Sequence, residues 1–403
     1  MELHLLTAAA LHWKRNLWVC FGGSFTTMVG MTLLLPFLPL YVEELGASGL
    51  SEIAWWSGVA YAATFLTAAI VAPLWGRIGD RYGRKLTLIR ASLGMAIAIS
   101  LIGLAGNVWQ LVALRALTGL LGGYASGSMT LVAVQTPREH NAWALGTLSS
   151  GIMAGSLVGP LVGGFLPPLM GIRNIFYLSG AVISIAFLAT ALLIVEDKST
   201  IGPRAPKAIG NADRLDRPLV ARMLMVGMLL TLANFSIEPI LTIYVGSLVE
   251  PANVTIAAGL VMAAAALGSI VSAPHMGRLA DRIGPTRVIA GGLTIAALLL
   301  VPQAFVTAEW QLLALRLMMG LALGGLLPCI ASLVRHAVPD QAAGTVLGLS
   351  TSAQYAGQVI GPLAGGFVGG HYGPRTVFAA TSLVMLVGAL LVATARDNRM
   401  ETG

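Results

Sequence analysis

The chain has 403 residues, of which 56% are hydrophobic and 10% charged, and it carries a formal net charge of +7. Its mean hydropathy is +0.82, and a water-soluble protein of this composition could not cover its surface with polar groups. A net positive charge can indicate nucleic-acid binding, but the placement of the basic residues described below excludes that class here.

Long apolar blocks recur along the whole chain. A helix that crosses the hydrocarbon of a bilayer needs about 20 apolar residues, and lipid offers the backbone no hydrogen bonds, so helices are expected. The blocks predict an all-α membrane protein with twelve transmembrane helices. The expected spans are 17–41, 53–75, 86–106, 108–134, 142–166, 174–195, 219–245, 254–276, 287–306, 310–334, 343–367 and 374–394.

The residues before the first span do not resemble a cleavable signal peptide. Glu2 is the only charge before the apolar run 3–11, where a signal would have Lys or Arg. Lys14 and Arg15 directly precede the first span and predict a cytoplasmic anchor. With the N-terminus inside, all but four of the 24 Lys and Arg residues are cytoplasmic, so both termini are expected in the cytoplasm. Of these four, Arg173 and Arg375 are expected on the outer side of the membrane, and Arg115 and Arg316 lie within helices.

The loop between the second and third spans, 76–85, reads GRIGDRYGRK. Its glycines would allow a tight turn between two helices. Asp80 is the lone acid among basic residues, so it could pair locally or lie against the positive N-terminus of a helix from the other half. The alternative is a solvated charged loop that only sets topology.

The second half of the chain repeats the first with an offset of about 200 residues. Four segments recur in the same order: 76–83 with 277–284, 111–119 with 312–320, 155–164 with 357–366, and 36–42 with 239–245. Six spans per half give both halves the same topology, and substrate sites in such parallel repeats lie at the repeat interface near the midplane. The predicted domains are an N-terminal half, 1–195, a polar cytoplasmic linker, 196–218, and a C-terminal half, 219–403.

Over nearly its whole length the sequence resembles the major facilitator superfamily. Segment 76–85 resembles the family signature between the second and third helices, Arg115 matches its fourth-helix arginine, and 151–164 is similar to its fifth-helix antiporter motif. Three further segments resemble the MdtG-type multidrug exporters of the drug:proton antiporter branch: 13–17, 36–43 and 143–149.

The resemblance implies the major facilitator fold, with two pseudo-symmetric six-helix halves, in a bacterial cytoplasmic (inner) membrane. It also implies a monomer that exports amphiphilic drugs or toxic organic compounds by alternating access, driven by the proton gradient without a cofactor. A rival is a proton-coupled uptake or exchange carrier for one specific small solute, which would need more polar groups in its cavity.

A second rival is a non-transporting receptor or a membrane enzyme. No nucleophile and base converge in the sequence, because all six histidines lie outside the span interiors. No Gly-x-x-x-x-Gly-Lys-Ser/Thr loop predicts ATP binding, and no His/Cys cluster has metal-ligand spacing. Cys20 and Cys329 lie inside apolar blocks, so neither a disulfide nor a metal site is expected.

For the 76–85 loop the resemblance implies a conformational latch that holds the cytoplasmic side closed, with a mirror-related copy in the second half. The residues concerned are Gly76, Asp80, Arg81, Gly83, Arg84, Asp281 and Arg282.

Arg115 and Arg316 lie about 7–8 Å inside their helices from the outer end, at the usual helical rise. Ionisable residues at such depths normally face protein or water and have partners. The resemblance implies that Arg115 takes part in proton relay or tunes a carboxylate. The alternative is that both arginines snorkel outward and tie helix ends together.

Gly155, Gly159 and Gly163 are spaced by four and make one bare helical stripe where another helix can pack closely. The resemblance implies that the fifth helix packs on the eighth, whose run 263–268 is small. A near-copy in the eleventh helix weakens the motif as a specific sign of antiport. The packing residues of the two motifs are Gly155, Gly159, Pro160, Gly163, Gly361 and Pro362.

Glu238 is the only one of the 17 acidic residues deep inside an expected span, about 10 Å from its outer end. An intramembrane acid that binds either a proton or a cationic substrate is the minimum machinery for exchange, and Pro239 is expected to kink the helix beside it. The alternative is a structural carboxyl bonded to a neighbour such as Asn234 or Gln358. The proton-coupling candidates are Glu238, Arg115, Glu43 and Glu44.

Met and aromatic side chains make adaptable apolar walls that accept varied ligands. We expect a substrate cavity lined by such residues and a few amides, although each could equally pack against another helix or face lipid. The candidates are Phe37, Tyr61, Phe65, Met129, Met153, Asn234, Met262, Gln354, Tyr355 and Gln358.

Overall fold

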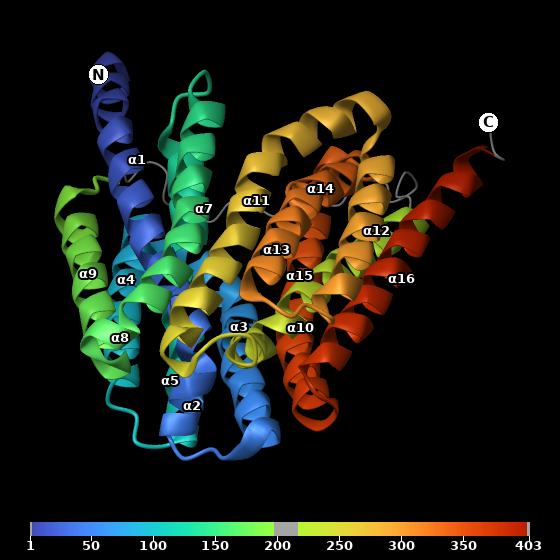
Figure 1. Ribbon diagram of the computed structural model, residues 1–403. Coiled ribbons are helices and arrows are strands. Elements are labelled where there is room, and N and C mark those ends of the chain that lie inside the picture. Colours follow the sequence, from blue (N-terminus) through green and yellow to red (C-terminus); the bar gives the residue numbers. More distant parts are fainter. Residues whose placement is uncertain (1, 197–216, 401–403) are drawn as a thin grey trace. The chain divides into compact units, whose positions relative to one another are not determined.

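A computed structural model describes residues 2–196 and 217–400 (Figure 1). Within these two ranges the chain is helical and contains no strand. The predicted linker, 196–218, lies almost wholly outside the described residues.

The first six expected spans correspond to helices that are in part interrupted. They are α1 (Glu2–Thr32), η1 (Leu35–Phe37), α2 (Leu38–Glu44), α3 (Gly49–Tyr82), α4 (Arg84–Ile102), α5 (Val108–Leu121), α6 (Tyr124–Gln135), α7 (Asn141–Phe165), α8 (Pro167–Met170) and α9 (Ile172–Leu193). The first span is thus α1, η1 and α2 in succession, and the fourth is α5 and α6.

The last six spans follow in the same order after the linker. They are α10 (Arg217–Gly246), η4 (Pro251–Asn253), α11 (Val254–Ile283), α12 (Pro285–Gln303), α13 (Glu309–Leu323), α14 (Leu326–His336), α15 (Asp340–Tyr372) and α16 (Pro374–Met400). In the described part of the chain, 11 helical stretches are long and apolar enough to cross a membrane. The twelfth span is α15, which is 33 residues long and rich in glycine.

The loop expected at 76–85 is mostly helix. α3 continues to Tyr82, and α4 begins at Arg84. Only Gly83 turns the chain, with a φ of 103°, a left-handed value that disfavours other residues. Gly284 does the same between α11 and α12, with a φ of 90°. The expected tight turn between two helices is therefore present, and a single glycine makes it.

Contacts divide the chain into two compact units. One unit contains residues 1–37 and 63–205, and the other contains 38–62 and 206–403. α3 therefore passes from one unit to the other at Ala62 and Ala63. The predicted domain boundaries lie in and beside the residues outside the described ranges and stay a prediction.

In the first unit, α1 lies between α7 and α9 and packs on both, and α4 packs on α9 (Figure 1). The glycine stripe of α7 faces α1. A Cβ on Gly155 would lie 2.7 Å from the carbonyl oxygen of Phe25, and one on Gly163 would overlap that of Leu33. The stripe therefore packs on α1, because small residues allow the backbones of the two helices to approach closely. The packing of the fifth helix on the eighth, which the resemblance implies, stays a prediction.

The second unit repeats this arrangement with α15 on α10. A Cβ on Gly361 would lie 2.5 Å from the carbonyl oxygen of Leu232, and one on Gly365 would overlap that of Ser236. Gly268, in the run 263–268, lies against Leu317 of α13. The duplication seen in the sequence therefore extends to how the helices pack inside each unit.

A second face of α15 packs on the start of α3, again within the second unit. A Cβ on Gly366 would lie 2.5 Å from the carbonyl oxygen of Ala54. The rings of Trp55 and Phe367 meet edge to face, 6.4 Å apart. Glycine on two faces of α15 therefore lets two neighbouring backbones, those of α10 and α3, approach it closely.

The fourth and tenth spans are interrupted at equivalent points. α5 ends at Leu121, before Gly123 with a φ of 100°, and α13 ends at Leu323, before Gly325 with a φ of 83°. Each break leaves carbonyl groups at the end of a helix without helical donors. In a membrane span such groups need partners from other helices.

Candidate functional site

Glu238 lies inside α10 and is partly buried. Its Oε2 atom is buried and has no hydrogen-bond partner, and among the described residues it is the one carboxylate oxygen in that state. Neither Asn234 nor Gln358, the partners considered for a structural role, is hydrogen-bonded to it. A buried carboxylate oxygen without a hydrogen bond is costly, and the coupling role of Glu238 stays a prediction.

Arg316, on α13, is the charge that Glu238 meets. The two side chains attract each other electrostatically without a direct ion pair. Arg316 is only 3% exposed, and its Nε and Nη2 atoms have no hydrogen-bond partner. Two opposite charges in a low-dielectric interior act strongly on each other. Their unmet hydrogen-bonding atoms can still donate or accept a hydrogen bond.

A series of contacts begins at the Arg316 guanidinium and continues through Phe378 and Tyr244 to Gln303. The Arg316 Cζ atom lies 6.0 Å from the ring centre of Phe378, whose ring lies 5.1 Å from that of Tyr244. The Tyr244 hydroxyl donates to the carbonyl oxygen of Gln303 at 2.9 Å. The Gln303 Nε2 donates to the sulfur of Met319, one turn from Arg316, at 3.6 Å. These groups are uncharged, so they do not neutralise Arg316.

The fourth-span arginine, Arg115, is buried to the same degree, 3% exposed. The hydroxyl of Thr64, on α3, donates to its carbonyl oxygen at 2.9 Å. Burial at this level does not fit an arginine that snorkels to the membrane surface, for either Arg115 or Arg316. The relay role of Arg115 stays a prediction.

A partly buried cation, Arg90 of α4, binds the end of α5 at the break in the fourth span. Its Nη1 donates to the carbonyl oxygens of Leu121 at 2.6 Å and Gly122 at 3.0 Å. Its guanidinium lies 3.5 Å from the ring centre of Trp75, whose Nε1 donates to the carbonyl oxygen of Leu120 at 2.9 Å. We call Arg90 and Trp75 the α5 clamp, because together they satisfy the carbonyl groups that the break leaves free.

The α5 clamp was missed from sequence, where Arg90 was counted with the cytoplasmic charges. A signal was present, since Arg90 falls inside the expected span 86–106. A charge at such a place must have a partner. Its partners are backbone carbonyl groups, which leave no trace in the side-chain pattern.

A scan against protein-family models matches residues 20–251 and 223–401 to the Major Facilitator Superfamily. The chain belongs to the major facilitator superfamily. It is 42% identical over 388 residues to the multidrug resistance protein MdtG of Enterobacter lignolyticus, across 95% of this chain and 92% of that one. It is 40% identical over 398 residues to the MdtG protein of Citrobacter koseri, across 97% of both chains.

Solved structures share the fold at low sequence identity. The nucleoside transporter NupG matches with a TM-score of 0.75 at 15% identity, covering 94% of this chain and 98% of that one. The human organic anion transporter MFSD10 matches with a TM-score of 0.67 at 19% identity, covering 94% and 99%. The predicted twelve-helix fold and the resemblance to MdtG-type proteins are therefore confirmed. This major facilitator is a multi-pass membrane transporter rather than a member of an enzyme family.

The family signature is placed at the ends of α3 and α4. Asp80 forms an ion pair with Arg84 one turn later, and Arg81 lies over the ring of Tyr82 at 5.3 Å. In the second copy, Asp281 and Arg282 are exposed. Local pairing is one of the two arrangements expected for Asp80, and the latch of this major facilitator stays a prediction.

Glu196, at the start of the predicted linker, caps the signature helix. Its carboxylate accepts from the backbone N–H of Arg84 at 2.6 Å and of Lys85 at 2.8 Å. A carboxylate at a helix N-terminus satisfies free donors and opposes the positive end of the helix dipole. Sequence reasoning missed this cap because the two segments are more than 100 residues apart.

Asn16, in the predicted cytoplasmic anchor, ties three helices together. Its Nδ2 donates to Gln135 Oε1 of α6 and to the Val195 carbonyl oxygen after α9, each at 2.7 Å. Its Oδ1 accepts from the Val195 N–H at 3.1 Å. In this major facilitator the anchor segment therefore also connects α1 to α6 and to the residues that follow α9.

The remaining candidates fall into two groups. Glu43 and Glu44, the alternatives to Glu238 at the end of the first span, lie on α2 and are exposed. Among the cavity candidates, Phe37, Tyr61 and Met262 are buried, and Phe37 meets the ring of Phe176 at 5.7 Å. The others are partly buried: Phe65, Met129, Met153, Asn234, Gln354, Tyr355 and Gln358. Their role in a substrate cavity stays a prediction.

The α5 clamp makes a prediction for stability. Replacing Arg90 with Gln should lower the free energy of unfolding by roughly 1–3 kcal/mol, because partly buried carbonyl groups lose a charged donor. Arg90→Lys should rescue only part of the loss, since an ammonium group cannot stack flat on Trp75. The measurement is the midpoint of thermal unfolding in detergent. The control is Arg287→Gln on α12, whose exposed side chain makes one 3.4 Å hydrogen bond, to the carbonyl oxygen of Ile283 at the end of α11. Equal midpoints for the two Gln variants would contradict the clamp.

Proposed function

We propose that this major facilitator exports amphiphilic drugs or related toxic organic compounds in exchange for protons, by alternating access, across a bacterial cytoplasmic membrane. Both termini lie in the cytoplasm, the transporter works as a monomer, and the proton gradient replaces any cofactor. The proposal is supported by the multidrug resistance proteins that match nearly the whole chain at 40–42% identity.

The observation that carries proton coupling is the unpartnered carboxylate of Glu238 beside Arg316. When Glu238 is ionised, its charge attracts Arg316 across the gap between α10 and α13; when it is protonated, that attraction disappears. A proton on Glu238 therefore changes which arrangement of the two helices is favoured. Coupling requires that the proton and the drug bias the same two-state equilibrium in opposite directions.

The alternative function is proton-coupled uptake or exchange of one specific small solute. The observation in its favour is Arg316, whose buried Nε and Nη2 atoms lack acceptors. A guanidinium with free donors suits a carboxylate or another anionic group. In that case Arg316 would bind the solute, and Glu238 would carry the proton.

The test uses inverted membrane vesicles that contain the transporter and are acidified inside. A lipophilic cationic dye such as ethidium should accumulate in the lumen only while the pH gradient is maintained, and a protonophore should stop it at once. Vesicles without the transporter are the control. Accumulation that survives the protonophore would contradict proton coupling. Failure with several cationic dyes, combined with gradient-dependent movement of a small organic anion, would favour the alternative.

A further inference from the structure

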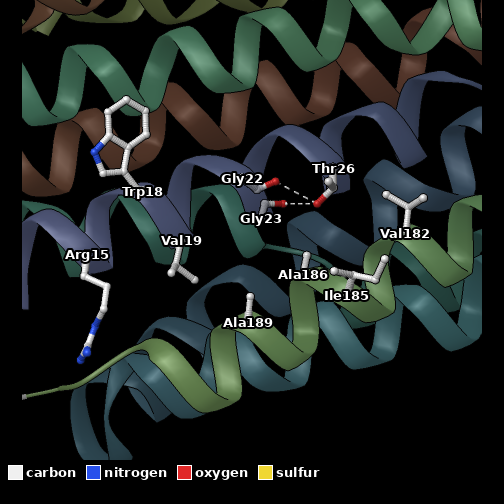
Figure 2. A pocket seen from close by; sticks show the side chains of 10 residues that line it. All are labelled: Arg15, Trp18, Val19, Gly22, Gly23, Thr26, Val182, Ile185, Ala186 and Ala189. Carbon is white, nitrogen blue, oxygen red and sulfur yellow. Dashed lines mark hydrogen bonds between the residues drawn. The ribbon is translucent and has the colours of Figure 1, made fainter.

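The first unit has a groove between α1 and α9 with a volume of about 540 Å³ (Figure 2). It is lined by Arg15, Trp18, Val19, Gly22, Gly23 and Thr26 from α1, and by Val182, Ile185, Ala186 and Ala189 from α9. None of these residues takes part in the site described above. The groove lies within one unit, so its shape depends only on how α1 and α9 pack.

Small residues hollow the groove and keep it apolar. A Cβ on Gly22 would have no neighbour within 4 Å, so this part of α1 is bare. The Thr26 hydroxyl donates to the carbonyl oxygens of Gly22 and Gly23 at 3.0 and 3.1 Å, as Figure 2 shows. Its hydrogen bond is therefore satisfied within its own helix. What remains for an occupant is a surface of aliphatic side chains and bare helix.

The groove opens outward rather than into the core. Ile185 is 66% exposed and Trp18 57% exposed, and both belong to helices that cross the membrane. In a membrane transporter such apolar surface is in contact with lipid. An acyl chain is the apolar group that is always present there, and each buried CH₂ favours its binding.

A free cation stands at one end of the groove. Figure 2 shows Arg15 at the end opposite Thr26 and Val182, with its side chain extended. Arg15 is exposed and makes no hydrogen bond or ion pair with any described residue. Trp18 lies one turn further along α1. An arginine and a tryptophan one turn apart at the end of a span are typical of the headgroup level of a bilayer.

We propose that this groove binds an anionic phospholipid, with one acyl chain between α1 and α9 and the headgroup phosphate on Arg15. The apolar wall selects a hydrocarbon chain, and the free guanidinium selects a negative headgroup. A cationic drug is disfavoured as the occupant because Arg15 would repel it. The proposal does not depend on what the transporter exports.

The test measures lipid retention by native mass spectrometry of the purified protein after exchange into equal amounts of phosphatidylglycerol and phosphatidylcholine. Wild type should retain one phosphatidylglycerol in preference to phosphatidylcholine. Arg15→Gln should reduce that preference about five-fold, the contribution expected of one basic residue at a membrane surface. The matched control is Lys14→Gln, which removes the neighbouring cation that lies 5.6 Å from the Trp13 ring and outside the groove.

A second variant tests the acyl-chain site. An added Cβ meets nothing within 4 Å at Gly22 or at Gly146 of α7. Gly22→Leu places a side chain in the groove and should abolish retention of both lipids, whereas Gly146→Leu, outside the groove, should leave retention unchanged. Equal preference in the Arg15→Gln and Lys14→Gln proteins would overturn the headgroup assignment. Retention of lipid by Gly22→Leu, or displacement of the lipid by ethidium, would overturn the acyl-chain site.

Discussion

Replacing Glu238 with Gln is expected to abolish dye accumulation driven by the proton gradient, down to the level of vesicles without the transporter. Glutamine has nearly the same shape but cannot release a proton in the membrane interior. Dye binding at equilibrium should persist, because the wall around the site is unchanged. The measurement compares the initial rate of dye accumulation with dye binding to the purified protein. The control is Glu250→Gln, which neutralises an exposed acid before η4 and should transport normally.

The Glu238→Gln protein retains Arg316 without its counter-charge, so its stability has to be measured separately. Removing one partner of a buried charge pair typically costs about 3–5 kcal/mol. Arg316→Met should cost a similar amount, and the double variant should be more stable than the sum of the single losses predicts. Additive losses would show that the two charges are independent. Normal transport by Glu238→Gln would transfer the coupling role to Glu43 or Glu44.

Replacing Gly163 with Ala should prevent normal folding or lower the free energy of unfolding by roughly 3 kcal/mol or more. The added Cβ would overlap the backbone carbonyl oxygen of Leu33, which cannot move aside as a side chain can. Gly146→Ala, on the same helix with nothing within 4 Å, should be neutral or stabilising by up to about 1 kcal/mol. The measurement is the folded yield and the unfolding midpoint in detergent.

The repeated packing predicts the same pair of results in the second unit. Gly365→Ala should be as harmful as Gly163→Ala, because its Cβ would overlap the carbonyl oxygen of Ser236. Gly348→Ala on the same helix, with open space around it, should be tolerated. A harmful change in one unit and a harmless one in the other would show that the two contacts are not equivalent.

Much of the fold could be predicted from sequence because the membrane limits the choices. Twelve apolar blocks of about 20 residues each are expected to form helices. Lipid offers the backbone no hydrogen bonds, and a helix satisfies its backbone groups within the segment itself. The recurrence of 76–83 as 277–284 and of 155–164 as 357–366 then indicated two related halves. The repeat also identified Arg115 and Arg316 as equivalent, and both are buried.

The candidate site was predictable only in part. Glu238 could be selected as the one acid deep in a span, because charge in hydrocarbon is costly wherever it lies. Its attraction to Arg316, on a helix 78 positions later, depends on the order of the helices within the unit. The same holds for the α5 clamp, in which Arg90 meets backbone carbonyl groups of another span.

What the sequence by itself determined is therefore local: the length of each span, its bare and polar faces, and the costly charges that require partners. What only the tertiary structure decided is which partner each face or charge has. The stripe of Gly155, Gly159 and Gly163 showed that some helix approaches α7 closely, and the structure identified that helix as α1. The physical reason is that helical periodicity defines a face from neighbouring residues, whereas the occupant of that face is set by how all the helices pack together.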